Sequence, residues 1–221
     1  MSEREVGTGQ GSQPAGCPSA LAQLRELVPR RPLRYAEALR IAERQAEALL
    51  RLAQSKEPPV PTELITRLPR LQVVIDDIPI SGSAHWNGSA WLIVLNRRHR
   101  APRQRFALAH EFKHVVDHTT HSFLYTGMPG MSAAEQAERA ADYFAGCLLT
   151  PRRWLKRACT NGQRTPREIG RLFTVPVPVA NTRLTQCGFA PRHRRGQRVL
   201  RIVLRTRLLR RCSRRRTRGT L

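Results

Sequence analysis

The sequence predicts an α+β fold in which a small antiparallel-type sheet packs on the helices that carry the functional residues. Two observations lead to this prediction. Apolar residues recur at helical spacing in both the first and the second half of the chain, and short β-rich runs lie between them. A length of 221 residues allows one domain with its own core and a small additional segment. No apolar run is long enough to span a membrane.

The expected elements follow one another in a simple order. Residues 1–31 contain GTGQGSQPAGCPS and are expected to form a flexible leader with little to pack. The apolar spacing of residues 35–53 predicts a helix, which ends before the prolines of KEPPVPTE. The run TELITRL predicts a shorter helix. The runs LQVVID, GSAHWNG and AWLIVLN, separated by Gly, Pro and Asn, predict about three strands within residues 71–96.

After the predicted strands, the segment APRQRFALAHEFKHVVDH predicts a buried helix that ends at about His118. Residues four apart on a helix lie about 40° round and about 6 Å along the axis from one another. His110 and His114 therefore point to one side, where both imidazoles can reach one ion. Glu111 lies about 100° round from His110, so its carboxylate comes beside that ion. In this HExxH arrangement the histidines bind zinc and the glutamate accepts a proton from the attacking water.

A bare HExxH match is also compatible with a helix that carries two incidental histidines, so a third ligand is needed to distinguish the two interpretations. His118 and His121 are the nearest candidates. A straight helix cannot wrap three successive turns around one ion, and VVDHTTH has no glycine for a bend. We therefore expect His118 to cap the helix C-terminus, where a cation is favoured, and we do not expect His121 to be a ligand.

A better candidate for the third ligand lies in MSAAEQAERAADYFAGCLLTP. Ser132 and Glu135 form a capping box that predicts a helix start at Ala133. Glu138 and Asp142 share the edge of this helix's apolar stripe, where a carboxylate is costly unless it is paired or bound to a metal. The alternative is a solvated helix edge. Glu138 as third ligand, with Asp142 holding a ligand histidine by its other ring nitrogen, satisfies both carboxylates and is typical of a catalytic zinc site.

The run RFALAHEFKHVVDH, followed by AERAADYFAGCLLTP, resembles the ImmA/IrrE family of metallopeptidases. The family pattern runs RFTLAHELGH…E-x-x-A-[DN]-x-F-A-x-x-L-L-x-P. EALRIAERQAEALL and WLIVLN resemble the helix and strand that precede it, and RLFTVPVPVANTRLTQCGF resembles the helical segment that follows. The resemblance therefore covers roughly residues 32–190 and implies a zincin-like metallopeptidase fold.

The resemblance also implies an activity and the roles of the site residues. Family members are intracellular zinc-dependent endopeptidases that cleave helix-turn-helix transcriptional repressors, which relieves repression of mobile elements, prophages or stress genes. By motif position, His110, His114 and Glu138 are implied as zinc ligands and Glu111 as the catalytic base. Asp142 is expected to support a ligand histidine. Manganese is the alternative metal in the cell.

Four segments are expected along the chain. They are the leader at 1–31, the zinc metallopeptidase domain at 32–160, a helix-turn-helix-like helical segment at 161–190 and an arginine-rich tail at 191–221. The tail has thirteen arginines and no acid in a chain of net charge +23, so we expect it to be disordered and to bind nucleic acid without specificity. Five scattered cysteines without CxxC, and no secretory signal, predict a reduced, cytoplasmic protein with no membrane partner.

The segment at 161–190 supports an alternative function. TPRE is a capping box that begins one helix, and a second helix could begin beside Pro176 or Pro178. Two helices of this size could form a helix-turn-helix, so the alternative is a DNA-binding regulator with a non-catalytic metal site. The prolines interrupt the second helix early, which favours packing on the peptidase domain or contact with the protein substrate.

Lys113 is the main departure from the family pattern, because HELGH is HEFKH in this chain. We expect its ammonium to oppose zinc binding modestly, and its side chain to take space where a sheet approaches. The substrate is expected to lie extended along an edge strand such as AWLIVLN. His118, His121 and Tyr125 are the candidates for stabilising the oxyanion.

Overall fold

The computed structural model describes residues 19–190. The expected leader up to residue 18 and the expected arginine-rich tail lie outside the described residues. The predicted α+β fold is confirmed, with helices before and after a three-stranded sheet. The elements are α1 (Ala20–Glu26), α2 (Tyr35–Leu52), α3 (Glu63–Thr66), β1 (Leu71–Asp76), β2 (Gly82–Trp86), β3 (Trp91–Asn96), α4 (Ala101–Asp117), α5 (His121–Leu124), α6 (Ala133–Leu149), α7 (Arg152–Thr160), α8 (Pro166–Phe173) and α9 (Val177–Gln186).

The sheet has the order β1-β3-β2, so β3 is its central strand. Strand β2 pairs antiparallel with β3, as expected, whereas β1 pairs with β3 in parallel. The parallel pair arises because the chain passes from β1 to the far edge of the sheet before β3 returns between the two. The near-continuous apolar run of β3 is typical of a strand that is buried on both faces, and the strand order shows that it also pairs at both edges. The expectation that AWLIVLN is an edge strand is therefore wrong, and β1 and β2 are the edges.

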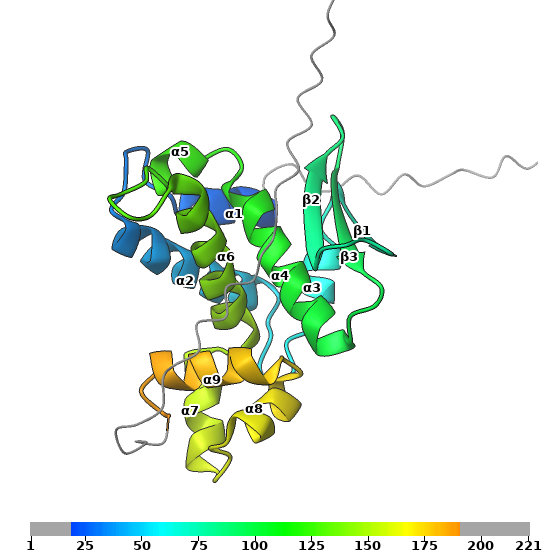
Figure 1. Cartoon of the computed structure of the whole chain (residues 1–221), viewed down its shortest axis with the longest axis vertical. Coiled ribbons are helices and arrows are strands. Elements are labelled where there is room, and N and C mark those ends of the chain that lie inside the picture. Colours follow the sequence, from blue (N-terminus) through cyan, green and yellow to red (C-terminus); the bar gives the residue numbers. More distant parts are fainter. Residues whose placement is uncertain (1–18, 191–221) are drawn as a thin grey trace, which may run out of the picture.

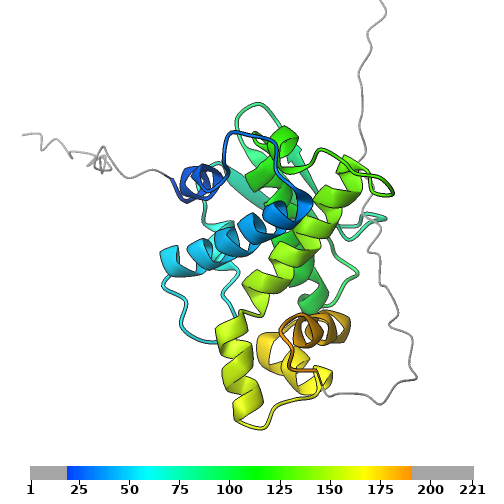
Figure 2. The same cartoon turned by 90° about the vertical axis from the view of Figure 1, so that its left-hand side faces the viewer.

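Helix α4 lies at the centre of the molecule. Figure 1 shows the sheet on one side of α4, with α6 and α2 on the other. Figure 2 shows α2 and α6 side by side in front of α4, and α6 packs against both of these helices. Burial of α4 extends to charged side chains, because Glu111, Lys113 and Asp117 are each at most 5% exposed. Each of these side chains therefore needs a partner from a neighbouring element.

Helix α1 corrects the extent of the expected leader. Ser19 caps the helix, accepting a hydrogen bond from the backbone N–H of Ala22, and Leu24 is fully buried. The Arg25 side chain donates to the carbonyl oxygens of Val115 and Val116 at the end of α4, at 2.9 and 3.1 Å. Residues 19–31 therefore do not belong to a flexible leader with little to pack, because α1 is anchored on α4.

Helix α8 begins where its capping box predicts, and α9 begins beside Pro176, one of its two expected starts. Thr165 and Glu168 form the capping box of α8, which ends at Phe173. Thr174 then adopts a left-handed backbone with φ of 53°, and α9 begins at Val177. Helix α9 packs against α6, so this segment covers the far end of the helix that carries Glu138 and Asp142.

No helix among residues 19–190 has the length and apolar content needed to cross a lipid bilayer. The cysteines of the same region, Cys147, Cys159 and Cys187, are buried free thiols.

Lys113 lies in a buried polar network on the side of α4 that faces α2. Its ammonium donates to Gln45 Oε1 of α2 at 2.7 Å and to Asp117 Oδ1 at 2.5 Å. The Tyr125 hydroxyl donates to the second oxygen of Asp117 at 2.5 Å, and Gln45 in turn donates to the Leu24 carbonyl of α1 at 3.0 Å. The expected place of Lys113 against the sheet is therefore wrong. Its side chain instead joins α4 to α2 and to the segment after α5.

Replacing Lys113 with alanine is expected to lower the free energy of unfolding by about 3–5 kcal/mol, because it leaves Asp117 as a buried charge without its cation. Chemical denaturation measures the change. Lys56→Ala is the matched control, since Lys56 is exposed and its loss is expected to change stability by less than about 0.5 kcal/mol. Equal denaturation midpoints for Lys113→Ala and wild type would show that the network contributes no stability.

Candidate metal centre

Two helices bring three ligand-type side chains to one point. His110 and His114 lie one turn apart on α4, and Glu138 comes from the facing α6. The two histidine Nε2 atoms are 3.2 Å apart. One oxygen of Glu138 lies 3.4 Å from His110 Nε2, and the other lies 3.4 Å from His114 Nε2. Among residues 19–190, this is the group of His, Cys, Asp and Glu side chains whose ligand atoms converge closely enough to hold one ion.

Asp142 fixes the orientation of His110. Its Oδ1 lies 2.9 Å from His110 Nδ1, one helical turn beyond Glu138. A carboxylate in this position accepts the Nδ1 proton, which leaves the Nε2 lone pair directed toward His114 and Glu138. Since His110 is only 2% exposed, its ring cannot easily turn away from this arrangement.

The charges around the two histidines call for one cation between them. Burial lowers the pKa of His110, but hydrogen bonds to Asp142 and Glu138 outweigh it and raise the pKa to about 10. Burial, together with the positive charge of His110, lowers the pKa of His114 to about 3, and Lys113 acts in the same direction. In the absence of a metal, one proton therefore resides on the pair. A second proton on His114 is unfavourable, because it would repel the charge on His110. A single ion that replaces the proton and contacts both Nε2 atoms avoids this repulsion.

The distances fit a small divalent ion. In tetrahedral zinc coordination, with Zn–N and Zn–O near 2.0–2.1 Å, neighbouring ligand atoms are about 3.3 Å apart. The ligand atoms here are separated by 3.2–3.4 Å without any adjustment. The His114 and Glu138 side chains are 21% and 23% exposed, so one side of the cluster is open to solvent. Three protein ligands and an open side are typical of a catalytic rather than a structural site.

Glu111 lies beside the cluster and against the sheet. It is 5% exposed, and burial raises the pKa of its carboxyl to about 7. Gly82 of β2 makes room for it, since a Cβ at position 82 would lie 3.0 Å from Glu111 Cγ and 3.3 Å from Oε1. The sequence alone did not point to Gly82, because its position against Glu111 depends on how β2 packs on α4.

The structure separates the three candidates for an oxyanion donor. The Tyr125 hydroxyl is buried and is committed to Asp117, so it cannot serve the site. His118 is the C-cap residue of α4, and its ring packs edge-on against Trp91. His121 is exposed as His118 is, and its ring packs edge-on against Tyr125. The two differ in that the charge of His121 contributes to the lowered pKa of His114.

Comparison with known proteins identifies related sequences and folds. A sequence model of the Peptidase_M78 family, described as the IrrE N-terminal-like domain, matches residues 72–185, which is more than half of the chain. Among solved structures, the chain is similar to a Mycobacterium tuberculosis transcriptional regulator, with a TM-score of 0.54 and 18% identity. This similarity covers 76% of the present chain and 52% of the other, so the chain spans about half the length of that regulator. It shows a shared fold. No curated protein sequence matches the chain.

Replacing Glu138 with alanine is expected to weaken zinc binding at least about 100-fold, because it removes one of three protein ligand groups, and loss of even an outer partner costs 10–100-fold. Isothermal titration with zinc chloride measures the affinity. Glu135→Gln is the control, since glutamine preserves the capping box one turn earlier on α6. If Glu138→Ala bound zinc with wild-type affinity while Glu135→Gln bound it more weakly, the assignment of Glu138 as the third ligand would be wrong.

Proposed function

The chain belongs to the Peptidase_M78 family, the family of the IrrE N-terminal-like domain, and on this premise we propose that it is a zinc-dependent intracellular endopeptidase. The observation that carries the proposal is the convergence of His110, His114 and Glu138 at ligand spacing, with Glu111 beside them. A metallopeptidase needs a metal held by few protein groups, an open side and an adjacent base. The cluster offers all three.

In this proposal His110, His114 and Glu138 hold the metal, and Asp142 holds His110 in the ligating tautomer. When bound, zinc supplies Lewis-acid chemistry by acidifying a water molecule and polarising the scissile carbonyl. The cluster of two imidazoles and a carboxylate also suits manganese, which is the alternative metal.

Glu111 is the proposed catalytic base. It follows His110 on α4 and therefore lies beside the ion rather than within the ligand set. Its carboxylate accepts a proton from the attacking water and passes it to the leaving amine as the C–N bond breaks. The absence of a side chain at Gly82 leaves the carboxylate its place against β2, where an added Cβ would lie 3.3 Å from Oε1. His121 is the proposed donor to the oxyanion.

Strand β2 is the proposed docking edge for the substrate, in place of β3. It is an edge strand, it packs on α4, and its first residue, Gly82, touches Glu111. An extended peptide that pairs with a free strand edge gains backbone hydrogen bonds that do not depend on its sequence. A substrate bound in this way would pass alongside the base and the metal ligands.

The proposed substrate is a helix-turn-helix transcriptional repressor, whose cleavage relieves repression of a mobile element, a prophage or stress genes. Support comes from the resemblance of the two-part motif to the ImmA/IrrE family. The exposed β2 edge also fits a protein substrate that presents an extended segment.

Helix α9 argues against the alternative of a DNA-reading helix. Its single basic residue, Arg183, is only 3% exposed and packs against Gly146 of α6. Readers of the major groove and its phosphates project basic side chains outward. We therefore propose that α8 and α9 support the peptidase helices, while the tail is the segment that binds nucleic acid without specificity.

The variant Glu111→Gln is expected to reduce cleavage by about 100- to 10,000-fold, because glutamine keeps the size of the side chain but cannot accept a proton. The substrate to offer is a helix-turn-helix repressor encoded beside this gene, with cleavage followed by electrophoresis and mass spectrometry. Cleavage by wild type is expected to stop with a chelator and to return with zinc or manganese. Zinc content and repressor capture should match wild type.

Two outcomes would contradict the peptidase function. One is equal cleavage by Glu111→Gln and wild type. The other is capture of the repressor by metal-loaded wild type without any cut. In the second case, retention of a specific DNA site near 0.2 M salt would favour the regulator, since tail-driven binding falls steeply with salt.

Gly82→Ala is expected to lower kcat roughly tenfold or more without changing zinc content. The added methyl must displace the Glu111 carboxylate by a few tenths of an ångström, and small misplacements of catalytic groups cost rate. Steady-state kinetics on the cleaved substrate measure the effect. Ser83→Ala is the matched control, because successive residues of a strand point to opposite faces. Equal kcat in both variants would remove Gly82 from the proposed mechanism.

A further inference from the structure

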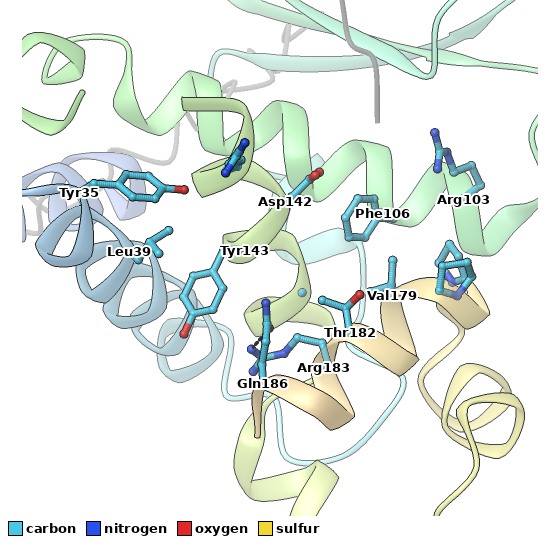
Figure 3. A pocket seen from close by; sticks show the side chains of 14 residues that line it. Tyr35, Leu39, Arg103, Phe106, Asp142, Tyr143, Val179, Thr182, Arg183 and Gln186 are labelled. Atoms are coloured by element: carbon cyan, nitrogen blue, oxygen red, sulfur yellow. Dashed lines mark hydrogen bonds between the residues drawn. The ribbon is translucent and has the colours of Figure 1, made fainter. Parts of the chain in front are cut away.

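A cavity of about 300 Å³ lies next to the metal centre, between α2, α4, α6 and α9 (Figure 3). We call it the arginine cavity, because Arg103 of α4, Arg139 of α6 and Arg183 of α9 line it. Asp142 also lines it and contributes the one carboxylate of its wall. Since the oxygen of Asp142 that meets His110 is already engaged, the cavity presents an excess of positive charge.

The three guanidinium groups have no ion pair within residues 19–190, because no carboxylate oxygen lies within 4.0 Å of any of them. Arg103 donates instead to the Ser81 hydroxyl at 2.7 Å, and Arg183 donates to the Gln186 amide oxygen at 2.8 Å. Both partners are neutral. The carboxylate of Asp142 lies in the wall and opposes the lowering of the pKa of Arg103 by burial, but it is one negative charge beside three guanidinium groups. The wall of the cavity therefore carries a net positive charge.

Arg183 makes the deficit most acute, because it is only 3% exposed and its Nε has no hydrogen-bond partner. Its guanidinium lies 5.7 Å from the centre of the Tyr143 ring, and its stem fills the space above Gly146, where a Cβ would meet Cδ at 2.8 Å. Its Nη2 donates to the Thr150 carbonyl at 3.5 Å, and on its other side it borders a second cavity lined by Glu43 and Glu47. A buried cation that forms no close ion pair is unfavourable. On the side of the arginine cavity, a ligand can supply a closer negative charge.

Apolar side chains form the rest of the wall. In Figure 3, Phe106 and Val179 lie between Arg103 and Arg183, and Leu39 lies on the side of α2. A ligand that fits this lining has an acidic group on an apolar stem. The side chain of glutamate, attached to an extended backbone, has this form.

The position of the cavity ties it to the proposed substrate path. Arg103 is seven residues before His110 and therefore lies on the same face of α4, about 10 Å along the axis. An extended peptide covers that distance in about three residues. Ser81, the partner of Arg103, directly precedes β2, so a chain that follows the β2 edge past Glu111 comes to the mouth of the cavity.

We propose that the arginine cavity is a specificity site for an acidic side chain of the peptide substrate, about three residues from the scissile bond. This inference rests on the proposed peptidase function. Arg103 and Arg139 receive the carboxylate at the open side, and Arg183 adds its charge from the buried side. A neutral or basic residue at the same position leaves Asp142 as the one negative charge beside the three cations.

The first test is cleavage of a library of decapeptides with randomised sequence by the full-length, zinc-loaded protein, with products sequenced by mass spectrometry. Wild type is expected to enrich Glu or Asp at least about tenfold at one position, about three residues from the cut and on one side of it. Arg103→Gln and Arg139→Gln are expected to lose the enrichment. Arg40→Gln, an exposed arginine of α2 outside the cavity, is the matched control and should keep it.

The second test measures binding without catalysis, using the full-length Glu111→Gln protein. Two pools of fluorescein-labelled decapeptides differ at one fixed position, Glu in one and Gln in the other, and fluorescence anisotropy gives their affinities. The Glu pool is expected to bind about tenfold tighter, and adding Arg139→Gln should remove that difference while adding Arg40→Gln should not. The arginine-rich tail is present in every variant, so its attraction for acidic peptides cancels in this comparison.

The outcomes distinguish a failure of the acidic specificity site from a failure of the proposed peptidase function. Absence of any cleavage by wild type overturns the peptidase function, and the anisotropy comparison then decides on the cavity alone. Cleavage without acidic enrichment overturns the specificity site but leaves the peptidase. Enrichment that survives in both Arg103→Gln and Arg139→Gln assigns the acidic preference to another part of the molecule and also overturns the inference.

Discussion

The burial of α4 is the constraint on which the rest of the structure depends. This helix carries ionisable side chains on several faces, yet it lies between the sheet and the other long helices. An uncompensated charge in such a place costs several kcal/mol, so each side chain needs a partner from a different direction. Lys113 contacts Gln45 of α2 and Asp117, and His110 contacts Asp142 of α6. For Glu111, β2 supplies space but no positive charge, and burial raises the pKa of its carboxyl to about 7. The elements around α4 thus compensate Lys113, Asp117 and His110 and leave Glu111 as the carboxyl with a raised pKa.

The same constraint makes the site rigid. His110 cannot turn without losing Asp142, and the α4 backbone cannot shift without straining the hydrogen bonds of Arg25 to the end of the helix. The spacing of the ligand atoms is therefore fixed before any ion binds. A preformed set of ligands avoids the cost of ordering at the moment of binding, and the proposed base, held by packing, needs no search for its position. Stability and the proposed function thus depend on the same contacts.

The sequence could predict whatever local spacing determines. His110 and His114 share a helix face, Ser132 and Thr165 begin helices, and Glu138 lies where a third ligand could reach. The order of the strands could not be predicted, because the apolar pattern of β3 shows that this strand is buried but not which strands pair with it. The contact between Lys113 and Gln45 could not be predicted either, since the two residues are 68 positions apart in the sequence. Gly82 and the arginine cavity likewise depend on contacts between elements that no local pattern encodes.

Three carboxylates surround the two histidines, and their contacts alone give them different roles. Asp142 faces Nδ1 of His110 and so fixes a tautomer. Glu138 places one oxygen against each Nε2, where a proton or a metal ion can be shared. Glu111 forms no ion pair with either histidine and lies in the space that Gly82 leaves free, and it is the proposed base. Because the Nε2 lone pair of His110 can hold either a proton or a metal, metal binding must release that proton, and affinity rises with pH while the proton is retained. Glu111 is the carboxylate outside this exchange, which is why we propose it, and not Glu138 or Asp142, as the base.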